Sequence, residues 1–263
     1  MATAPLRVWR EKDGRLLRIR LSRPKANVLD AAMIAALDEA FAIAARPAQG
    51  EPADPALRGI LLDAEGPHFS FGASVEEHLP AKAPAMLRGF HALLVRMLEC
   101  QVPVLVAIRG QCLGGGLEVA MAGHVLFAAP DAKLGQPEIQ LGVFPPAASA
   151  LLPERVSRAA AEDLLLSGRS IDGTEAARIG LVTAAAADPE AAALAWFDAH
   201  AAKHSAVALR LAALAARRDL AARVRAKLAA LEQLYASDLM NTRDAVEGLT
   251  AFLEKRPVRW EDR

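Results

Sequence analysis

Residues 111–120, Gln-Cys-Leu-Gly-Gly-Gly-Leu-Glu-Val-Ala, constrain the fold more than any other part of this chain. They follow the apolar run 102–108 and open into an alanine-rich segment, an order that predicts a strand, a glycine turn and a helix. Glycines at such a junction leave backbone N–H groups open to a ligand, and the first turn of a helix adds further unpaired donors. The junction is therefore a place to hold an anion.

The first ionisable residue after the glycines is an acid, Glu118. An acid does not suit a phosphate cradle, but it does suit a developing oxyanion with a carboxylate beside it. Gly110 and Gly114 do not form G-x-G-x-x-G, and neither Lys-Ser nor Lys-Thr follows the glycines, so the common phosphate motifs are absent. The plainer alternative is close packing at a tight turn, with Glu118 as an ordinary acid at a helix start.

The charge balance excludes some classes of partner. The 263 residues carry 31 Lys and Arg against 31 Asp and Glu, so no net field attracts nucleic acid or an anionic membrane surface. Cys100 and Cys112 have neither metal-ligand nor disulfide spacing, which suits a reducing compartment. Residues 1–10 hold no apolar signal core, and no run of about 18 apolar residues occurs. We expect a cytoplasmic protein with no membrane segment, no nucleic-acid partner and no metal.

Before the junction, the chain alternates strands, helices and corners. Residues 17–21 alternate apolar residues with arginines, which predicts a half-buried strand. Residues 30–45 have helical spacing with Asp30 as the N-cap, and 45–57 is expected to be a loop before a strand over 59–62.

A second glycine-bearing corner follows over residues 66–78, and an amphipathic helix over 86–98 leads back to the strand over 102–108. Two units, each a strand followed by a corner, therefore lie in series.

Beyond the junction the pattern predicts, in order, a strand over 125–129, an extended segment over 133–138, a stop at Pro145-Pro146, and helices over 159–167 and 174–179. Gly168 and Gly180 follow the two helices, where glycine commonly ends a helix. Asp188-Pro189 then begins a nearly all-helical part, in which the alanine-rich stretch 206–231 is expected to be one helix. We expect an α/β core with the active site over residues 1–188 and a helical region over 189–263.

Three features could converge on one site: the corner at Gly72-Ala73, the glycine junction with Glu118, and the acid Glu138. Two amides from separate corners would hold one carbonyl oxygen, while two carboxylates would handle a water and a proton. Loss of a single oxyanion donor typically costs roughly 2.7–4 kcal/mol, and proton transfer by a placed carboxylate contributes on the order of 10² to 10⁴ in rate. Together these effects suffice for adding water across an activated double bond.

The order and spacing of these segments resemble the enoyl-CoA hydratase/isomerase (crotonase) superfamily from about residue 21 onward. Five ordered motifs carry the resemblance: Ser-Arg-Pro-Lys-Ala-Asn-Val-Leu at 22–29, Phe-Ser-Phe-Gly-Ala at 69–73, Cys-Leu-Gly-Gly-Gly-Leu-Glu at 112–118, Gly-Gln-Pro-Glu at 135–138, and a C-terminal signature over 247–256. The resemblance implies an α/β fold, a crotonase-type spiral of ββα units with a helical C-terminal part. It also implies assembly as a homotrimer or homohexamer.

By this resemblance, the amides of Ala73 and Gly115 bind the oxygen of an acyl-CoA thioester, and Glu118 and Glu138 activate water and deliver a proton. The residues that it places at the substrate or its CoA are Lys25, Ala26, Phe71, Gly72, Gly114, Phe144, Phe252 and Lys255. The last two complete the CoA site, within one subunit or across a subunit boundary. No cofactor is implied, because CoA is part of the substrate.

Two segments depart from the common hydratase pattern where the acyl group is expected. Phe71 precedes Gly-Ala-Ser where many members have a small residue before Gly-Ala-Asp, and Phe-Pro-Pro-Ala-Ala-Ser at 144–149 replaces a Pro-Gly, glycine-rich run. Together with Phe90-His91 and residues 151–155, these segments are similar to the cyclohexa-1,5-diene-1-carbonyl-CoA hydratases of anaerobic aromatic degradation. That similarity implies hydration of a cyclic dienoyl-CoA, with the dienolate protonated at its far end.

Alternatives stay open at this point. A straight-chain 2-enoyl-CoA hydratase or isomerase would use the same two amides and two glutamates, with protonation at the α carbon. A non-catalytic acyl-CoA-binding or RNA-binding member of the superfamily is disfavoured by the two acids and the zero net charge. Glu76, Glu77 and His78 are either extra catalytic groups or a solvated face beyond the first corner.

Overall fold

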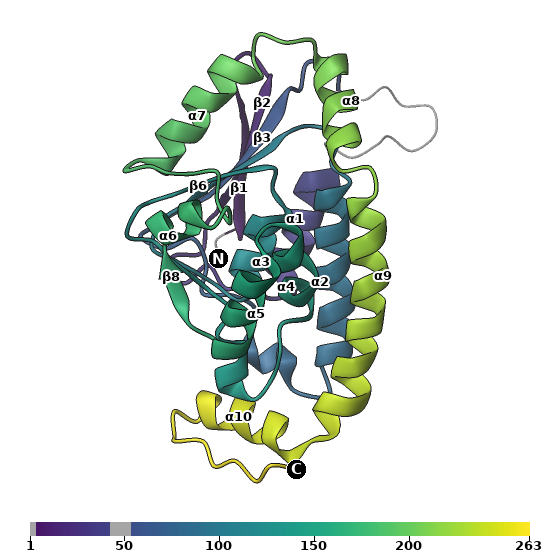
Figure 1. Cartoon of the computed structure of the whole chain (residues 1–263). Coiled ribbons are helices and arrows are strands. Elements are labelled where there is room, and N and C mark those ends of the chain that lie inside the picture. The colour runs from purple at the N-terminus through teal and green to yellow at the C-terminus, as the bar shows by residue number, and fades with distance from the viewer. Residues whose placement is uncertain (1–3, 43–53) are drawn as a thin grey trace.

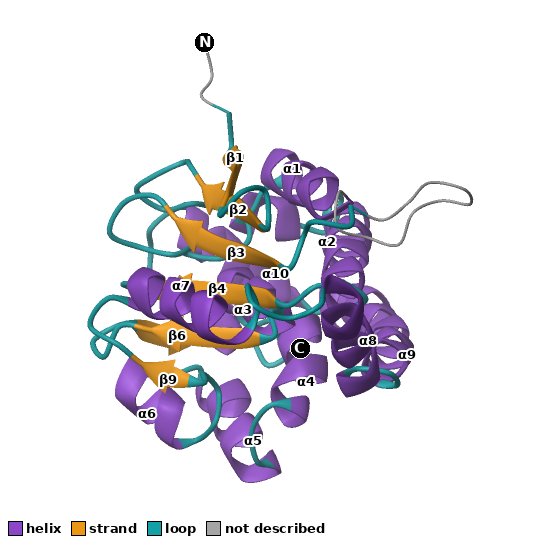
Figure 2. Ribbon diagram, turned by 90° about the horizontal axis from the view of Figure 1, so that it is seen from above, coloured by secondary structure: helices purple, strands orange, loops and turns teal. Residues whose placement is uncertain are grey.

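The computed structural model of the chain describes residues 4–42 and 54–263, so most of the loop expected over 45–57 lies outside the described residues. Two sheets form its framework (Figure 1), and Figure 2 shows the larger of them with its strands side by side. The larger sheet consists, in spatial order, of β1 (Leu6–Glu11), β2 (Leu16–Leu21), β3 (Gly59–Ala64), β4 (Val104–Ile108), β6 (Val125–Ala128) and β9 (Ala184–Ala185). The smaller sheet consists of β5 (Gln111–Leu113), β7 (Lys133–Gly135) and β8 (Ser170–Asp172).

The larger sheet is parallel from β2 to β9, and only the β1–β2 hairpin is antiparallel. Parallel neighbours need crossover connections, and the helices between the strands supply them. The helices before residue 189 are α1 (Ala31–Ala42), α2 (Ala83–Leu98), α3 (Gly115–Ala122), α4 (Pro146–Leu151), α5 (Arg158–Ser167) and α6 (Gly173–Arg178). Short 3₁₀ turns at Val75–His78, Pro137–Leu141 and Leu152–Glu154 complete this part.

Several predicted helix ends are confirmed by their caps. The carboxylate of Asp30 accepts the N–H of Met33 at 2.9 Å before α1, and Asp188 does the same for Ala191 at 3.1 Å before α7 (Pro189–His200). Gly168 has a φ of 65° in the left-handed region and ends α5, as its position predicted.

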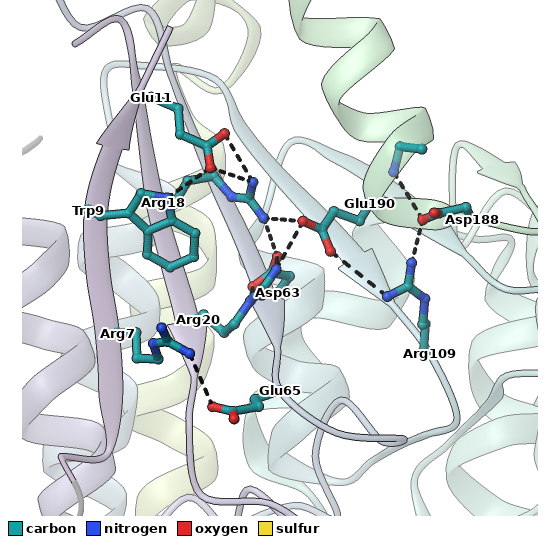
Figure 3. A network of polar contacts seen from close by, with 11 residues as sticks. Arg7, Trp9, Glu11, Arg18, Arg20, Asp63, Glu65, Arg109, Asp188 and Glu190 are labelled. Atoms are coloured by element: carbon teal, nitrogen blue, oxygen red, sulfur yellow. Dashed lines mark hydrogen bonds and ion pairs between the residues drawn. The ribbon is translucent and has the colours of Figure 1, made fainter. Parts of the chain in front are cut away.

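The prediction of a half-buried strand over residues 17–21 is wrong, because both faces of β2 are covered. Its apolar face joins the main core with α1 and α2, and the other face, with Arg18, lies under α7 (Pro189–His200). Arg18 is only 2% exposed. It donates to Asp63 at 2.5 Å and to Glu190 of α7 at 2.6 Å, in the network that Figure 3 shows. Of the arginines that suggested a solvated face, Arg18 is therefore a buried ion-pair partner and Arg20 a half-buried one.

The alanine-rich stretch 206–231 is two helices rather than one: α8 (Ala206–Ala216) and α9 (Leu220–Gln233). The break falls at Arg217, where the backbone leaves the helical region. The guanidinium of Arg217 donates to the carbonyl of Ala122 at 2.8 Å and also to that of Gly123, at the end of α3. A tertiary contact thus interrupts a segment whose composition favours a continuous helix.

Every element within residues 189–263 is a helix or a helical turn, and the last is α10 (Arg243–Leu253). A π-helical turn at Leu234–Asp238 and a 3₁₀ turn at Leu239–Asn241 separate α9 from α10. α9 lies along α2, and its apolar side chains enter the same core as the sheet (Figure 1). The division at residue 188 stays a prediction. None of the helices in residues 4–42 and 54–263 has the length and apolar character needed to cross a bilayer.

Candidate active site

The two glycine corners lie side by side, as the sequence predicted. Ser70 donates its N–H to the carbonyl of Gln111 at 3.0 Å, and its own carbonyl accepts the N–H of Leu113 at 3.0 Å. A Cβ placed on Gly115 would stand 3.0 Å from the backbone nitrogen of Ala73, so only glycine lets the two amides approach this closely. Among the described residues, the N–H groups of Ala73 and Gly115 have no acceptor. The pair can therefore hold one carbonyl oxygen.

Glu118 lies in the first turn of α3, and its carboxyl is almost completely buried. Its Oε1 accepts the backbone N–H of Ala148 at 2.6 Å. Burial raises the pKa of Glu118 to about 7, and the N–H of Ala148 opposes that shift because it favours the charged form.

Ala148 is the third residue of α4, which begins directly after Pro145. The prediction that Pro145-Pro146 ends an element is wrong, because these prolines begin a helix. Proline is tolerated at the first helical position, where its missing N–H has no intrahelical partner to lose. The N–H of Ala148 is one of the unpaired donors of that first turn, and Glu118 satisfies it.

Glu138 lies on the 3₁₀ turn Pro137–Leu141 and not at the end of an extended segment, because β7 ends at Gly135. Its Oε1 is 2.5 Å from the position that a Cβ on Gly114 would take. The carboxyl therefore lies directly beside the second corner. Gln136 is fully buried next to it, and an NH₂ group turned toward Glu138 would donate to both carboxyl oxygens at 3.1 and 3.2 Å.

Burial, and then the nearby charge of Glu118, raise the pKa of Glu138 well above its ordinary value. Two carboxyls that share one buried site do not both ionise readily. Since Glu118 has the backbone donor, we assign the charge to Glu118 and the proton to Glu138. The arrangement provides one base and one acid beside two oxyanion donors.

A single cavity brings together most of the residues that the sequence placed at the acyl group: Phe71, Gly72, Ala73, Gly114, Gly115, Glu118, Glu138 and Phe144. Its remaining walls are mainly apolar and come from α2, from the prolines at the start of α4, and from Leu249 of α10. Phe71, at 45% exposed, also lies edge-on to the ring of His68. Flat and rigid walls of this kind suit a ring better than a flexible chain.

Of the four residues predicted to contact CoA, two lie on a turn beside the cavity and two lie away from it. The carbonyl of Ala26 accepts the N–H of Phe71 at 2.9 Å, so the turn with Lys25 adjoins the cavity. Phe252 and Lys255 do not line the cavity, and both are exposed at the end of α10. The structure therefore does not bring these two residues to the acyl site, and their contact with CoA stays a prediction.

Glu76 and Glu77 do not line the cavity. Glu76 pairs with Lys82 at 2.8 Å, and the carboxylate of Glu77 accepts the N–H of Ala31 at 3.1 Å. His78 does line the cavity, and its Nδ1 donates to the carbonyl of Ser74 at 2.8 Å.

Sequence reasoning gave no individual role to Ala148, Gln136, His91 or Leu249, although each lies in a segment that carried the resemblance. The Pro-Pro pair that begins α4 was an available signal for the first. The roles of the others depend on tertiary packing.

The described part of the chain offers this site no set of metal ligands, and the thiol beside the site is buried. In residues 4–42 and 54–263, no cluster of three or more His, Cys, Asp or Glu side chains could hold a metal ion. Cys112 is fully buried beside the glycines, and burial raises the pKa of its thiol far above the ordinary range. It is a small core residue.

A family model for enoyl-CoA hydratase/isomerase matches residues 11–263. This chain belongs to that family. The family has the α/β crotonase fold, which confirms the fold class predicted from the five motifs.

The relatives include enzymes with different reactions. The chain is 63% identical to the cyclohexa-1,5-dienecarbonyl-CoA hydratase of Thauera aromatica over 263 residues, which cover 100% of this chain and 99% of the relative. It is 32% identical to the carnitinyl-CoA dehydratase of Proteus mirabilis, with 95% of this chain and 96% of the relative covered. Among solved structures, an enoyl-CoA hydratase from Mycobacterium avium superimposes with a TM-score of 0.85 at 27% identity, covering 98% of this chain and 100% of that one.

Proposed function

We propose that this enzyme adds water to cyclohexa-1,5-diene-1-carbonyl-CoA and forms 6-hydroxycyclohex-1-ene-1-carbonyl-CoA. The observation that carries the proposal is the cavity itself, in which two free amides and two coupled carboxyls meet inside aromatic and proline-bearing walls. The 63% identity to a relative with that named activity over the full chain supports the choice of substrate.

In the proposed reaction, the amides of Ala73 and Gly115 hold the thioester oxygen. The carboxylate of Glu118 takes a proton from water, whose oxygen attacks the carbon β to the thioester. Negative charge moves onto the thioester oxygen as the dienolate forms, and the two amides stabilise it there. A proton then closes the addition, and Glu138 is the neutral carboxyl beside the thioester corner.

A straight-chain 2-enoyl-CoA hydratase is the competing function. The position of Glu138 beside Gly114 favours it, because this carboxyl is placed for protonation near the α carbon. The walls disfavour it, since Phe71, Phe144 and Pro146 enclose the acyl position where a flexible chain needs no flat surface.

A substrate panel separates the two functions. Purified enzyme is given cyclohexa-1,5-diene-1-carbonyl-CoA and crotonyl-CoA in parallel, and the products are identified by mass spectrometry and NMR. We expect the higher kcat/KM with the cyclic dienoyl thioester and the 6-hydroxy product. Hydration of crotonyl-CoA alone would refute the proposal in favour of the straight-chain function. Turnover of neither thioester would point to a non-catalytic role.

We also propose that CoA runs past Lys25 and Ala26 toward Phe252 and Lys255, and that the enzyme assembles as a homotrimer or homohexamer. Light scattering coupled to size-exclusion chromatography tests the assembly. A Lys255→Ala variant should raise KM for the thioester while kcat stays near that of the wild type.

A further inference from the structure

His91 is a buried titratable side chain on the cavity wall, and the reaction described above, which uses the two glutamates, gives it no role. It lies on the inner face of α2, is 4% exposed, and lines the same cavity as Glu118, Glu138 and the two amides. A buried imidazole in an otherwise apolar helix face is costly unless its nitrogens find partners.

One of its nitrogens is held by an acid from the C-terminal helices. Nδ1 of His91 makes a short contact with the carboxylate of Glu232 on α9. A carboxylate at Nδ1 fixes the ring orientation and leaves Nε2 as the nitrogen available for proton transfer. Nε2 is buried and has no hydrogen-bond partner among the described residues.

The carboxylate also supports the charged ring. Burial lowers the pKa of His91 below its ordinary value, and Glu232 opposes that shift through a hydrogen bond and through its charge. The other histidine on the wall, His78, is hydrogen-bonded to a backbone carbonyl instead. His91 is therefore the better placed of the two to take up and release a proton.

The position of His91 complements that of Glu138. The carboxyl of Glu138 lies beside Gly114, at the thioester end of the cavity. The ring of Phe90 borders the other oxyanion glycine, 3.4 Å from the position of a Cβ on Gly115, and the ring of His91 lies 6.3 Å from that of Phe90, where α2 meets α9. The cavity thus has one proton donor near the thioester and another group further along its wall.

We propose that His91, held by Glu232, is a further catalytic residue that protonates the dienolate at the carbon remote from the thioester. This inference rests on the proposed function, since only a cyclic dienoyl substrate requires a proton at that remote carbon. Ordinary hydration ends with a proton on the α carbon, for which Glu138 suffices.

The step balances without an added reagent. Water forms the C–O bond at the β carbon as Glu118 takes one of its protons, and the π electrons move through the α carbon to the thioester oxygen. The dienolate then uses that electron pair to form a C–H bond at the remote carbon with the Nε2 proton of the imidazolium form of His91, whose charge Glu232 balances. Nε2 keeps the N–H bonding pair, and the neutral ring retains its other proton on Nδ1. Return of the proton from Glu118 to His91 through water restores the enzyme, so one water is added in total.

Three variants test the assignment. His91→Gln removes the donor, and Glu232→Gln removes the acid that holds it. Arg225→Gln is the matched control, because Arg225 also joins α9 to α2, through Glu99, but does not line the cavity. Each variant is assayed with cyclohexa-1,5-diene-1-carbonyl-CoA and with crotonyl-CoA, and its thermal midpoint is measured. NMR of products formed in D₂O gives the position of the new C–D bond.

With the cyclic substrate, we expect His91→Gln to lower kcat by about 10²-fold or more, with little change in KM. Glu232→Gln should lower it by about 10-fold, and Arg225→Gln should leave it unchanged. Residual product from His91→Gln should shift toward the isomer protonated at the α carbon. Any hydration of crotonyl-CoA should be retained in all three variants.

Two results would overturn the assignment: wild-type kcat and product in His91→Gln, or a loss that affects both thioesters equally. If His91→Gln does not fold, the same contrast is read from Glu232→Gln. A wild-type enzyme that hydrates crotonyl-CoA but not the cyclic dienoyl-CoA would instead refute the proposed function, and this inference with it.

Discussion

Ala148 donates its backbone N–H to Oε1 of Glu118 at 2.6 Å and thereby fixes a carboxylate at the start of α4. Burial and the nearby charge of Glu118 raise the pKa of Glu138 further than burial raises that of Glu118. The two glutamates occupy one cavity in different surroundings, and this difference separates their protonation states. The backbone contact with Ala148 favours the base at Glu118.

The elevated pKa of Glu118 predicts a pH-dependent stability. An acid whose folded pKa is raised to about 7 stabilises the protein fully below its unfolded pKa of about 4.3, and the contribution is lost as the pH rises through 7. Glu118→Gln should therefore be more stable than the wild type above pH 7, by up to about 3 kcal/mol. Urea unfolding at pH 4.5 and pH 8 measures it, and an equal difference at both values would contradict the assigned shift.

Glu138→Gln should lower kcat for hydration of crotonyl-CoA by about 10² to 10⁴-fold, because an amide cannot deliver the proton that the α carbon takes up. KM should change little, since the thioester is held by the amides of Ala73 and Gly115. Glu154→Gln, at an exposed pair with Arg223, is the control for loss of an acid elsewhere. Unchanged turnover in Glu138→Gln would remove this residue from the mechanism.

Arg217 should matter for stability although it lies outside the cavity. It donates to two carbonyls at the end of α3, and Arg155 donates to the neighbouring carbonyl of Met121 at 2.7 Å. Arg217→Met removes the donor to the buried carbonyl of Ala122, whereas Gly123 keeps Arg155, and the loss should cost about 1–3 kcal/mol. The next residue, Arg218, is exposed, and Arg218→Met should have almost no effect. Similar midpoints of thermal unfolding for the two variants would argue against this role.

The ion network under α7 gives a second stability prediction (Figure 3). Asp63 pairs with Arg18 at 2.5 Å and with Arg20 at 2.6 Å, and its removal leaves these two arginines with Glu11 and Glu190 as their remaining partners. Asp63→Ala should cost about 1.5–3 kcal/mol, the loss of hydrogen bonds between charged groups, whereas Asp198→Ala, at the partly exposed pair with Lys12, should cost less than about 1 kcal/mol. Chemical denaturation of both variants measures the contrast. The network does not line the cavity, so kcat of folded Asp63→Ala should stay near that of the wild type.

Sequence patterns were sufficient where structure is local. The helix over 86–98, the caps at Asp30 and Asp188 and the two glycine corners follow from spacing and turn chemistry, and each is present. The five ordered motifs gave the fold class, because glycines and acids at such spacings are rare outside one site geometry.

Patterns failed where a distant contact decides the outcome. Arg18 has the alternation of a solvated strand face, but α7 arrives from residues 189–200 to cover it. The break at Arg217 depends on carbonyls of α3, which no window around residue 217 contains. His91 and Glu232 are 141 positions apart, so only the folded chain shows that they meet.

The C-terminal helices affect when the active site forms during synthesis and folding. Leu249 closes the cavity, Glu232 holds a cavity side chain, and Arg217 secures the helix that carries Glu118. A chain still emerging from the ribosome therefore carries both glycine corners and both glutamates long before it has a finished pocket. Newly made protein should therefore gain activity only after its last helices dock.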